Sequence, residues 1–289
     1  MKLAIRAVGI TDRKLRNLHL KIKSGEIYGI LGEAGAGKTT LLQMLCGATF
    51  PAAGRVELFG KPLTVQNRRN LVRHVGVLIG EPAFYEHLSV EENMRIHAAY
   101  FDLGDDAHMH RIFKDFGLFH LLRKRAGILT RTERQMVGIA RAFLTKPALI
   151  LLDEPVSFMD PAERVRILSV MERFRTRFGI TFVLSGQHLA ELRKMTERIG
   201  ILQDGRITRE FIVKSAQKRT MAALRPAISN LNGTDYGLAR GHSLADLGNR
   251  RAEVTGFSPN PKPHLLKKER FVVFPDGTKG KGIGGRQFG

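Results

Sequence analysis

The first sixty residues alternate between short apolar runs and polar turns, which predicts a group of strands. Apolar residues occupy alternate positions over residues 15–22, and residues 26–32 are largely apolar. A period of two is the pattern of a strand with one buried face. We expect strands over residues 1–9, 15–22, 26–32 and 54–60.

Three later runs are nearly continuous in apolar residues, which is typical of strands buried on both faces of a parallel sheet. They cover residues 74–80, 148–152 and 180–186. Residues 199–207 form a further expected hairpin, with Asp204 and Gly205 at its turn.

Between these strands, apolar residues recur at helical spacing. We expect helices over residues 39–49, 89–101, 106–122, 130–143, 161–179 and 188–199. Two of these helix starts carry the capping-box pattern, Ser89 with Glu92 and Thr130 with Glu133. The alternation of strands and helices indicates an α/β fold with a mostly parallel sheet.

The chain divides into a patterned part and an unpatterned part. The helices between residue 82 and about residue 145 form an insert between two strands, so we expect a helical subdomain there. The periodicity fades after residue 217. Residues 218–289 are basic and rich in Gly and Pro, and we expect a flexible extension.

Net charge, cysteine content and the length of apolar runs limit the kinds of partner and the cellular compartment that we expect. The net charge of +20 favours an anionic partner, although charge alone does not indicate nucleic acid. The single cysteine, Cys46, excludes an intramolecular disulfide framework and is expected to be buried. No run approaches the length of a membrane span, and Arg6 interrupts the first apolar stretch. We expect a cytoplasmic protein that reaches a membrane only through another subunit or a surface contact.

Residues 32–39 match the P-loop pattern of two glycines followed by Lys and Thr, placed between an expected strand and an expected helix. Backbone N–H groups of such a loop surround phosphate oxygens, and the start of the helix adds a positive dipole end. Lys38 should reach the β and γ phosphates, and Thr39 should bind Mg²⁺. The expected nucleotide-binding residues are Gly32, Glu33, Ala34, Gly35, Ala36, Gly37, Lys38, Thr39 and Thr40.

Two carboxylates follow the buried run at residues 148–152 and complete the expected site. Asp153 is the candidate on the Mg²⁺ side, and Glu154 is the candidate base for an attacking water. An acidic pair at a strand end is weak evidence by itself. Behind an apolar strand, and downstream of a P-loop, it becomes strong evidence for an ATPase.

At this point the chain resembles the nucleotide-binding subunit of an ABC transporter. The resemblance rests on residues 32–40, 139–155 and 157–161 and extends over roughly residues 3–212. Residues 77–93 are similar to the subgroup that exports bacitracin, lantibiotics and other antimicrobial peptides.

The resemblance implies a P-loop NTPase core, an N-terminal antiparallel β subdomain and a helical subdomain, together forming a cassette over residues 1–217. It implies ATP hydrolysis with Mg²⁺ at the interface of a homodimer or heterodimer of cassettes. The dimer energises a separate membrane-spanning permease, and the cassettes are peripheral on the inner face of the membrane. Asp160 matches the aspartate that bridges two cassettes; it is also a candidate helix N-cap ahead of Pro161.

Several positions depart from the family pattern. The position of the glutamine loop falls on Gly80, followed by Glu81, which either approaches Mg²⁺ or lies in an exposed loop. The position of the switch histidine falls on Gln187, with His188 one residue later. Either side chain is a candidate for the γ-phosphate, and His188 is equally a surface residue. The aromatic residue expected to stack on adenine is absent from the first strand region.

The family signature before the helix at residue 130 is altered most. Thr130 keeps a hydroxyl, Arg131 and Thr132 replace two glycines, and Glu133 replaces a glutamine. This part of the site should face the nucleotide of the partner cassette, so hydrolysis by a homodimer is expected to be slow. The alternative is a regulatory or nucleic-acid-associated ATPase of the same family that does not transport, which the basic residues 218–289 motivate. The single cassette argues against the members of the family that act on the ribosome. A P-loop kinase does not explain residues 139–142 so close before Asp153.

Overall fold

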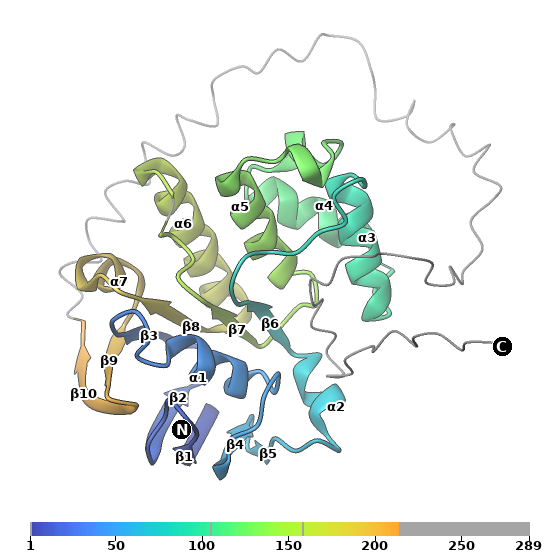
Figure 1. Cartoon of the computed structure of the whole chain (residues 1–289). Helices are drawn as coiled ribbons and strands as arrows, with labels where there is room; N and C mark the ends of the chain where they lie inside the picture. The colour runs from blue at the N-terminus through green and yellow to red at the C-terminus, as the bar shows by residue number, and fades with distance from the viewer. Residues whose placement is uncertain (1, 105, 158, 214–289) are drawn as a thin grey trace, which may run out of the picture. The chain divides into compact units, whose positions relative to one another are not determined.

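The computed structural model describes residues 2–104, 106–157 and 159–213. The predicted flexible extension, residues 218–289, therefore lies outside the described residues. The described elements form two sheets with helices packed between and above them (Figure 1). None of the helices in the described ranges is long and apolar enough to cross a membrane.

The larger sheet has six strands in the order β10-β9-β3-β8-β7-β6. Its neighbours pair in parallel, except for the antiparallel pair β9–β10, which closes at Asp204 and Gly205. The predicted mostly parallel sheet and its terminal hairpin are thus confirmed. The strands are β3 (Ile27–Leu31), β6 (Val75–Leu78), β7 (Leu149–Leu152), β8 (Thr181–Gly186), β9 (Arg198–Gln203) and β10 (Arg206–Ile212).

The smaller sheet is antiparallel and confirms the β subdomain implied near the N-terminus. Its order is β2-β1-β4-β5, and β2 alternates strictly between buried and exposed side chains. Its strands are β1 (Leu3–Thr11), β2 (Leu18–Lys23), β4 (Ala53–Leu58) and β5 (Lys61–Pro62).

The helices lie on both faces of the larger sheet. In Figure 1, α1 lies between the two sheets, whereas α3, α4, α5 and α6 lie on the opposite side of the larger sheet. The helices are α1 (Lys38–Leu45), α2 (Arg68–Val72), α3 (Val90–Tyr100), α4 (Asp106–Asp115), α5 (Arg131–Ala142), α6 (Pro161–Phe178) and α7 (Leu189–Met195). Two short 3-10 turns cover Phe119–Leu121 and Ala126–Ile128.

Strand β7 separates two apolar cores because its side chains alternate between them. Ile150 and Leu152 pack with residues of α3 to α6, whereas Leu149 and Leu151 pack with α1 and the smaller sheet. All four side chains are fully buried. The two cores hold both faces of this strand in place, and with them the acids that follow Leu152.

Three helix predictions were too long, and the first of them, over residues 39–49, ends at Leu45. The helix expected over residues 106–122 ends at Asp115, since Gly117 adopts a positive φ of 67° that a helix does not allow. The helix expected over 188–199 ends at Met195, since Thr196 is extended and leads into β9. There the pairing of β9 with β3 outweighs the local helical pattern. Cys46 is buried as predicted, and burial raises the pKa of its thiol to about 11.

Helix α5 approaches the sheet closely at two glycines. A Cβ at Gly76 in β6 would lie 2.0 Å from the carbonyl oxygen of Ala142. A Cβ at Gly138 in α5 would lie 2.6 Å from Pro82 Cγ. Larger side chains at these positions would push the helix away, so both glycines fix where the first turn of α5 points.

Candidate functional site

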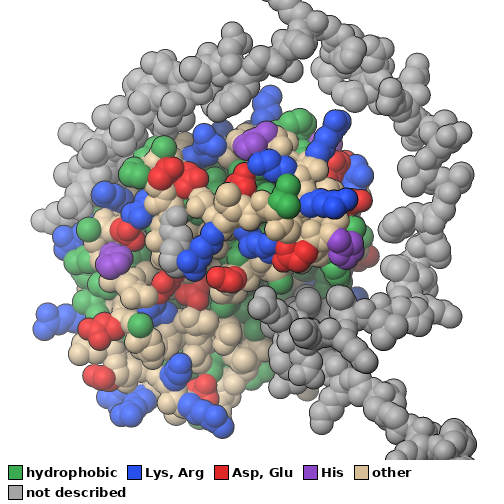
Figure 2. Space-filling model, turned by 45° about the horizontal axis from the view of Figure 1, so that its top comes forward, with side chains coloured by type: hydrophobic (Ala, Val, Ile, Leu, Met, Phe, Trp, Pro, Cys, Tyr) green, Lys and Arg blue, Asp and Glu red, His purple; other side chains and the backbone are tan. Residues whose placement is uncertain are grey.

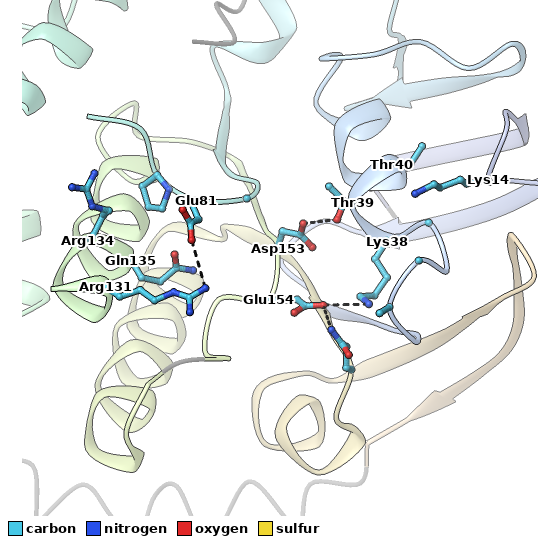
Figure 3. A pocket seen from close by; sticks show the side chains of 16 residues that line it. Lys14, Lys38, Thr39, Thr40, Glu81, Arg131, Arg134, Gln135, Asp153 and Glu154 are labelled. Carbon is cyan, nitrogen blue, oxygen red and sulfur yellow. Dashed lines mark hydrogen bonds and ion pairs between the residues drawn. The ribbon is translucent and has the colours of Figure 1, made fainter. Parts of the chain in front are cut away.

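One cavity of about 610 Å³ gathers most of the predicted site (Figure 3). The P-loop and the start of α1 line one side, and the first turns of α5 with residues 80–82 line the other. The ends of β7 and β8 lie between them. The lining residues are Lys14, Ala34, Gly35, Gly37, Lys38, Thr39, Thr40, Gly80, Glu81, Pro82, Arg131, Arg134, Gln135, Asp153, Glu154 and Gln187.

The P-loop takes its shape from glycines. Gly35 and Gly37 adopt positive φ angles of 81° and 104°, which side-chain-bearing residues rarely adopt. Gly37 is the N-cap of α1, so the positive end of that helix points into the cavity. Gly32 continues β3 by donating its N–H to the carbonyl oxygen of Gly186 over 3.1 Å. The predicted order of strand, loop and helix is therefore present.

Lys38 is buried within this loop and points into the cavity (Figure 3). Its Nζ donates hydrogen bonds to the carbonyl oxygens of Gly32 (2.9 Å) and Glu33 (3.0 Å). It also lies 3.2 Å from Glu154 Oε1, an ion pair. These contacts hold the ammonium group within the loop, in reach of a phosphate that the loop would bind.

Thr39 and Asp153 approach each other from α1 and from the end of β7. Thr39 Oγ1 donates a hydrogen bond to Asp153 Oδ2 over 2.7 Å, and Ser185 Oγ donates to the other carboxylate oxygen. Mg²⁺ prefers oxygen ligands and is commonly held by one or two carboxylates together with substrate phosphates. No cluster of three or more His, Cys, Asp or Glu side chains suited to a metal occurs in the described ranges. The pair fits Mg²⁺ that arrives with a nucleotide.

Glu154 follows Asp153 in a strained backbone conformation. Its φ of 46° lies in the left-handed region, which is uncommon for residues other than glycine and often marks functional sites. Its N–H donates to Ser185 Oγ over 2.9 Å, and Gln187 Nε2 donates to Glu154 Oε1 over 2.9 Å. Partial burial raises the pKa of Glu154, but hydrogen bonds from Gln187 and Lys38 outweigh it, so the pKa falls below its ordinary value. The side chain is a carboxylate at neutral pH.

The structure separates the two candidates for the switch position. Gln187 follows β8 and lines the cavity beside Glu154. His188 is exposed and is the N-cap residue of α7, without a side-chain capping bond, and it is not among the lining residues. One step along this segment turns the side chain away from the site.

The altered glutamine loop faces the altered signature. Glu81 Oε1 lies 3.5 Å from Arg131 Nη2, on the same side of the cavity (Figure 3). Both side chains are highly exposed, so this ion pair is weak. Gly80 has a positive φ of 70° and open space around it, which fits a loop that can move. Glu81 lies against Arg131 rather than against Asp153, and its predicted approach to Mg²⁺ stays a prediction.

Both predicted capping boxes are confirmed, and the one at the start of α5 holds the Glu133 side chain against the helix start. The N–H of Glu133 donates to Thr130 Oγ1 (3.2 Å), and the N–H of Thr130 donates to Glu133 Oε2 (2.9 Å). Lys124 Nζ donates to the other oxygen, Oε1, over 2.9 Å. Partial burial raises the pKa of Glu133, but the hydrogen bonds with Thr130 and Lys124 outweigh burial, so the pKa falls below its ordinary value. The acid is therefore ionised, and its negative charge is compensated by Lys124 and by the helix start. Neither Thr130 nor Glu133 lines the cavity of its own chain.

Arg134 carries the next polar contacts along α5. It makes two hydrogen bonds to the Glu86 carboxylate, at 2.9 and 2.8 Å, and lies over the ring of Phe84. Arg141 donates to the carbonyl oxygen of Ala83 over 2.7 Å, and burial lowers its pKa to about 10. Arginines of α5 therefore hold the segment that follows Gly80 and Glu81. These contacts link the altered signature at the start of α5 to the altered glutamine loop.

Asp160 occupies the predicted capping position. Its Oδ1 accepts from the N–H of Glu163 over 2.8 Å, and Pro161 is the first residue of α6. It is not among the cavity-lining residues, so its bridging role between cassettes stays a prediction. Ser185 and Lys14 were not predicted. A hydroxyl at the end of the strand beside β7 was a usable signal for Ser185, whereas the pattern around Lys14 gave none.

Comparison with known proteins places this site in context. The family described as ABC transporter matches residues 15–157. The bacitracin transport ATP-binding protein BcrA of Bacillus licheniformis is 30% identical over 222 residues, which cover 77% of this chain and 72% of that protein. The uncharacterized ABC transporter ATP-binding protein YcbN of Bacillus subtilis is 34% identical over 201 residues, covering 70% of this chain and 65% of that protein. The chain thus spans 65% to 72% of the length of these two relatives.

Solved structures agree on the fold. CbiO1 from Clostridium perfringens, described as part of the ABC transporter complex cbiONQ, superposes with a TM-score of 0.67 at 22% identity, covering 80% of this chain and 99% of that one. The bacterial ABC transporter cassette MJ0796, solved as a dimer, gives a TM-score of 0.68 at 23% identity, covering 73% of this chain and 99% of that one. The arrangement of two sheets and a helical layer is the fold of these cassettes.

Proposed function

This chain belongs to the ATP-binding proteins of ABC transporters, and from that premise we propose that it binds ATP with Mg²⁺ and hydrolyses it at the cavity described above. The observation that carries the proposal is the set of contacts around Glu154. A buried P-loop lysine, an amide and a strand-end hydroxyl converge on two adjacent carboxylates.

Each residue has a chemical task in this mechanism. The N–H groups of residues 32–37 and the start of α1 bind the phosphates, and Lys38 exchanges its ion pair with Glu154 for the β and γ phosphates. Glu154, ionised and oriented by Gln187, then accepts a proton from the attacking water. Thr39 and Asp153 would hold Mg²⁺, which neutralises charge on the phosphates when it is bound.

We further propose that the transported cargo is a peptide of the bacitracin type. The support is the similarity to two bacitracin transport ATP-binding proteins, of Bacillus licheniformis and Enterococcus faecalis. The second is 31% identical over 205 residues. In this role the chain pairs with a second cassette and with a membrane-spanning permease. The permease holds the pair against the inner face of the membrane.

The alternative of a nucleic-acid-associated ATPase is less well supported. On the face drawn in Figure 2, Lys and Arg side chains are interspersed with Asp and Glu rather than gathered in one patch. A phosphate-binding surface for RNA needs a continuous basic stripe. RNA binding that weakens steeply with salt would favour this alternative.

Nucleotide binding tests the proposal. Calorimetric titration of the full chain with ATP and Mg²⁺ should give saturable binding that Lys38→Ala abolishes. Lys61→Ala, an exposed lysine in β5, is the matched control and should bind as the unaltered chain does. Equal affinity in the Lys38 variant would refute the assignment.

Transport is tested in cells. Co-expression of the chain with its membrane-spanning permease should raise the bacitracin concentration that a sensitive bacterium tolerates. Glu154→Gln should remove that protection. Protection that persists in this variant would mean that hydrolysis at this site does not drive transport.

A further inference from the structure

Lys14 is a cation of the cavity that the proposed mechanism does not use. Its side chain is exposed and lines the cavity. Within the described residues it makes no ion pair or side-chain hydrogen bond. An exposed lysine without a partner is ordinary at a surface, but this one stands at the mouth of a phosphate-binding loop.

The backbone that carries Lys14 is fixed. Leu15 is fully buried, and its carbonyl oxygen accepts from the N–H of Asp12 over 2.9 Å. The N–H of Arg16 donates to the carbonyl oxygen of Gly205 over 2.9 Å. A Cβ at Gly37 would lie 2.9 Å from Leu15 Cδ2 and 3.5 Å from Lys14 Cβ. The turn over residues 12–16 is thus packed against the P-loop, which holds Lys14 at a set place beside it.

That place is on the nucleoside side of the site. In Figure 3, Lys14 lies beside Thr40, to the right of Lys38, whereas Asp153 and Glu154 lie to the left of Lys38. A nucleotide whose γ phosphate meets Glu154 and whose β phosphate meets Lys38 continues past Thr40 toward its ribose and base. Lys14 is the lining side chain beside Thr40 at this end of the cavity.

The same region lacks a stacking partner. No aromatic side chain occurs among the cavity-lining residues that the structure describes. An aromatic ring contacts the face of any base and so gives affinity without reading the base edge. An ammonium group carries three donors and no acceptor, so it distinguishes base edges by their acceptors.

We propose that Lys14 contacts the base and makes this cassette accept guanine nucleotides at least as well as adenine nucleotides. Guanine offers two neighbouring acceptors, N7 and O6, whereas adenine offers N7 beside the N6 amino donor. Lys14 can donate to both guanine acceptors but to only one in adenine, where it also faces a donor. The inference rests on the proposed nucleotide-binding function and specifies its substrate.

Titration of the full chain with the Mg²⁺ complexes of ATP, GTP and ITP tests this inference. ITP keeps N7 and O6 but lacks the 2-amino group. We expect GTP and ITP to bind at least as tightly as ATP. Lys14→Met, which keeps the length and removes the charge, should weaken GTP and ITP by about five- to tenfold and ATP by less than about twofold. Lys14→Arg should retain the guanine preference.

Three results would overturn the inference. They are a preference of the unaltered chain for ATP, equal weakening of all three nucleotides in Lys14→Met, and no change in that variant. Equal weakening would mean that Lys14 contacts the phosphates, which the nucleotides share. Failure of the unaltered chain to bind any of the three would instead refute the proposed function.

Discussion

Gln187 Nε2 donates a hydrogen bond to Glu154 Oε1 over 2.9 Å, and the same oxygen lies 3.2 Å from Lys38 Nζ. The candidate base is thus held between a neutral donor and a cation. This arrangement differs from the family pattern, in which a histidine stands at the switch position. We propose that Gln187 acts as a positioning residue for Glu154.

Removing the amide should therefore slow hydrolysis without weakening nucleotide binding. We expect Gln187→Ala to reduce kcat by about ten- to hundredfold, because Glu154 loses the bond that orients it. The KM for ATP should change little. Gln187→His should restore much of the rate and introduce a dependence on pH near 6.5, where histidine titrates. Parallel losses of binding and rate in Gln187→Ala would contradict a positioning role.

The pH profile should also report on Glu154. Its folded-state pKa is lowered below the ordinary value of a glutamate, so the carboxylate stays ionised to lower pH than an ordinary glutamate does. We expect the loss of kcat/KM that follows protonation of Glu154 to begin at lower pH than an unperturbed glutamate would give. Gln187→Ala removes one of the bonds that lower this pKa, so its acidic limb should move to higher pH. An unchanged limb would mean that the amide does not act on the carboxylate.

Glu133→Gln should leave hydrolysis unchanged and lower stability slightly. The charge of Glu133 is already compensated by Lys124 and by the helix start, so its removal should change the field at the partner's nucleotide little. Loss of this charge should cost about 0.5–1 kcal/mol and lower Tm by about 1–3 °C, measured by thermal unfolding. A rise in ATPase activity would show that the acid restrains the site of the partner cassette.

Restoring the signature glycines should accelerate a slow homodimer. Arg131→Gly combined with Thr132→Gly removes side chains where the family brings backbone close to the partner's nucleotide. We expect a higher steady-state ATPase rate together with a less stable α5, since glycines in the first turn lose helix propensity of up to about 1 kcal/mol each. Arg131→Ala with Thr132→Ala is the matched control, and an equal rate in both variants would mean that close backbone approach is not limiting.

The sequence predicted those parts of the site that depend on local pattern. The positions of Lys38 and Thr39 were predictable because the strand, the P-loop and the helix follow one another directly in the sequence. Asp153 and Glu154 follow because a buried strand ends there. The fold class followed in the same way from alternating strands and helices.

What could not be predicted depends on contacts between distant segments. Whether Gln187 or His188 faces the cavity depends on where β8 ends and α7 begins. If these elements were shifted by one residue, the other side chain would face the cavity. Lys14 reaches the cavity only because Leu15 and Arg16 pack on Gly37 and Gly205. Ser185 joins Asp153 because β7 and β8 are neighbours in the sheet. Tertiary packing decided each of these positions.

The central claim is that this chain hydrolyses ATP through Glu154 although its signature is altered. The direct measurement is the steady-state ATPase rate of the chain assembled with its permease, compared with that of Glu154→Gln. We predict measurable hydrolysis that falls by at least about hundredfold in the variant while ATP binding is retained. Equal rates in the two proteins, or retained binding with no hydrolysis in either, would contradict the account.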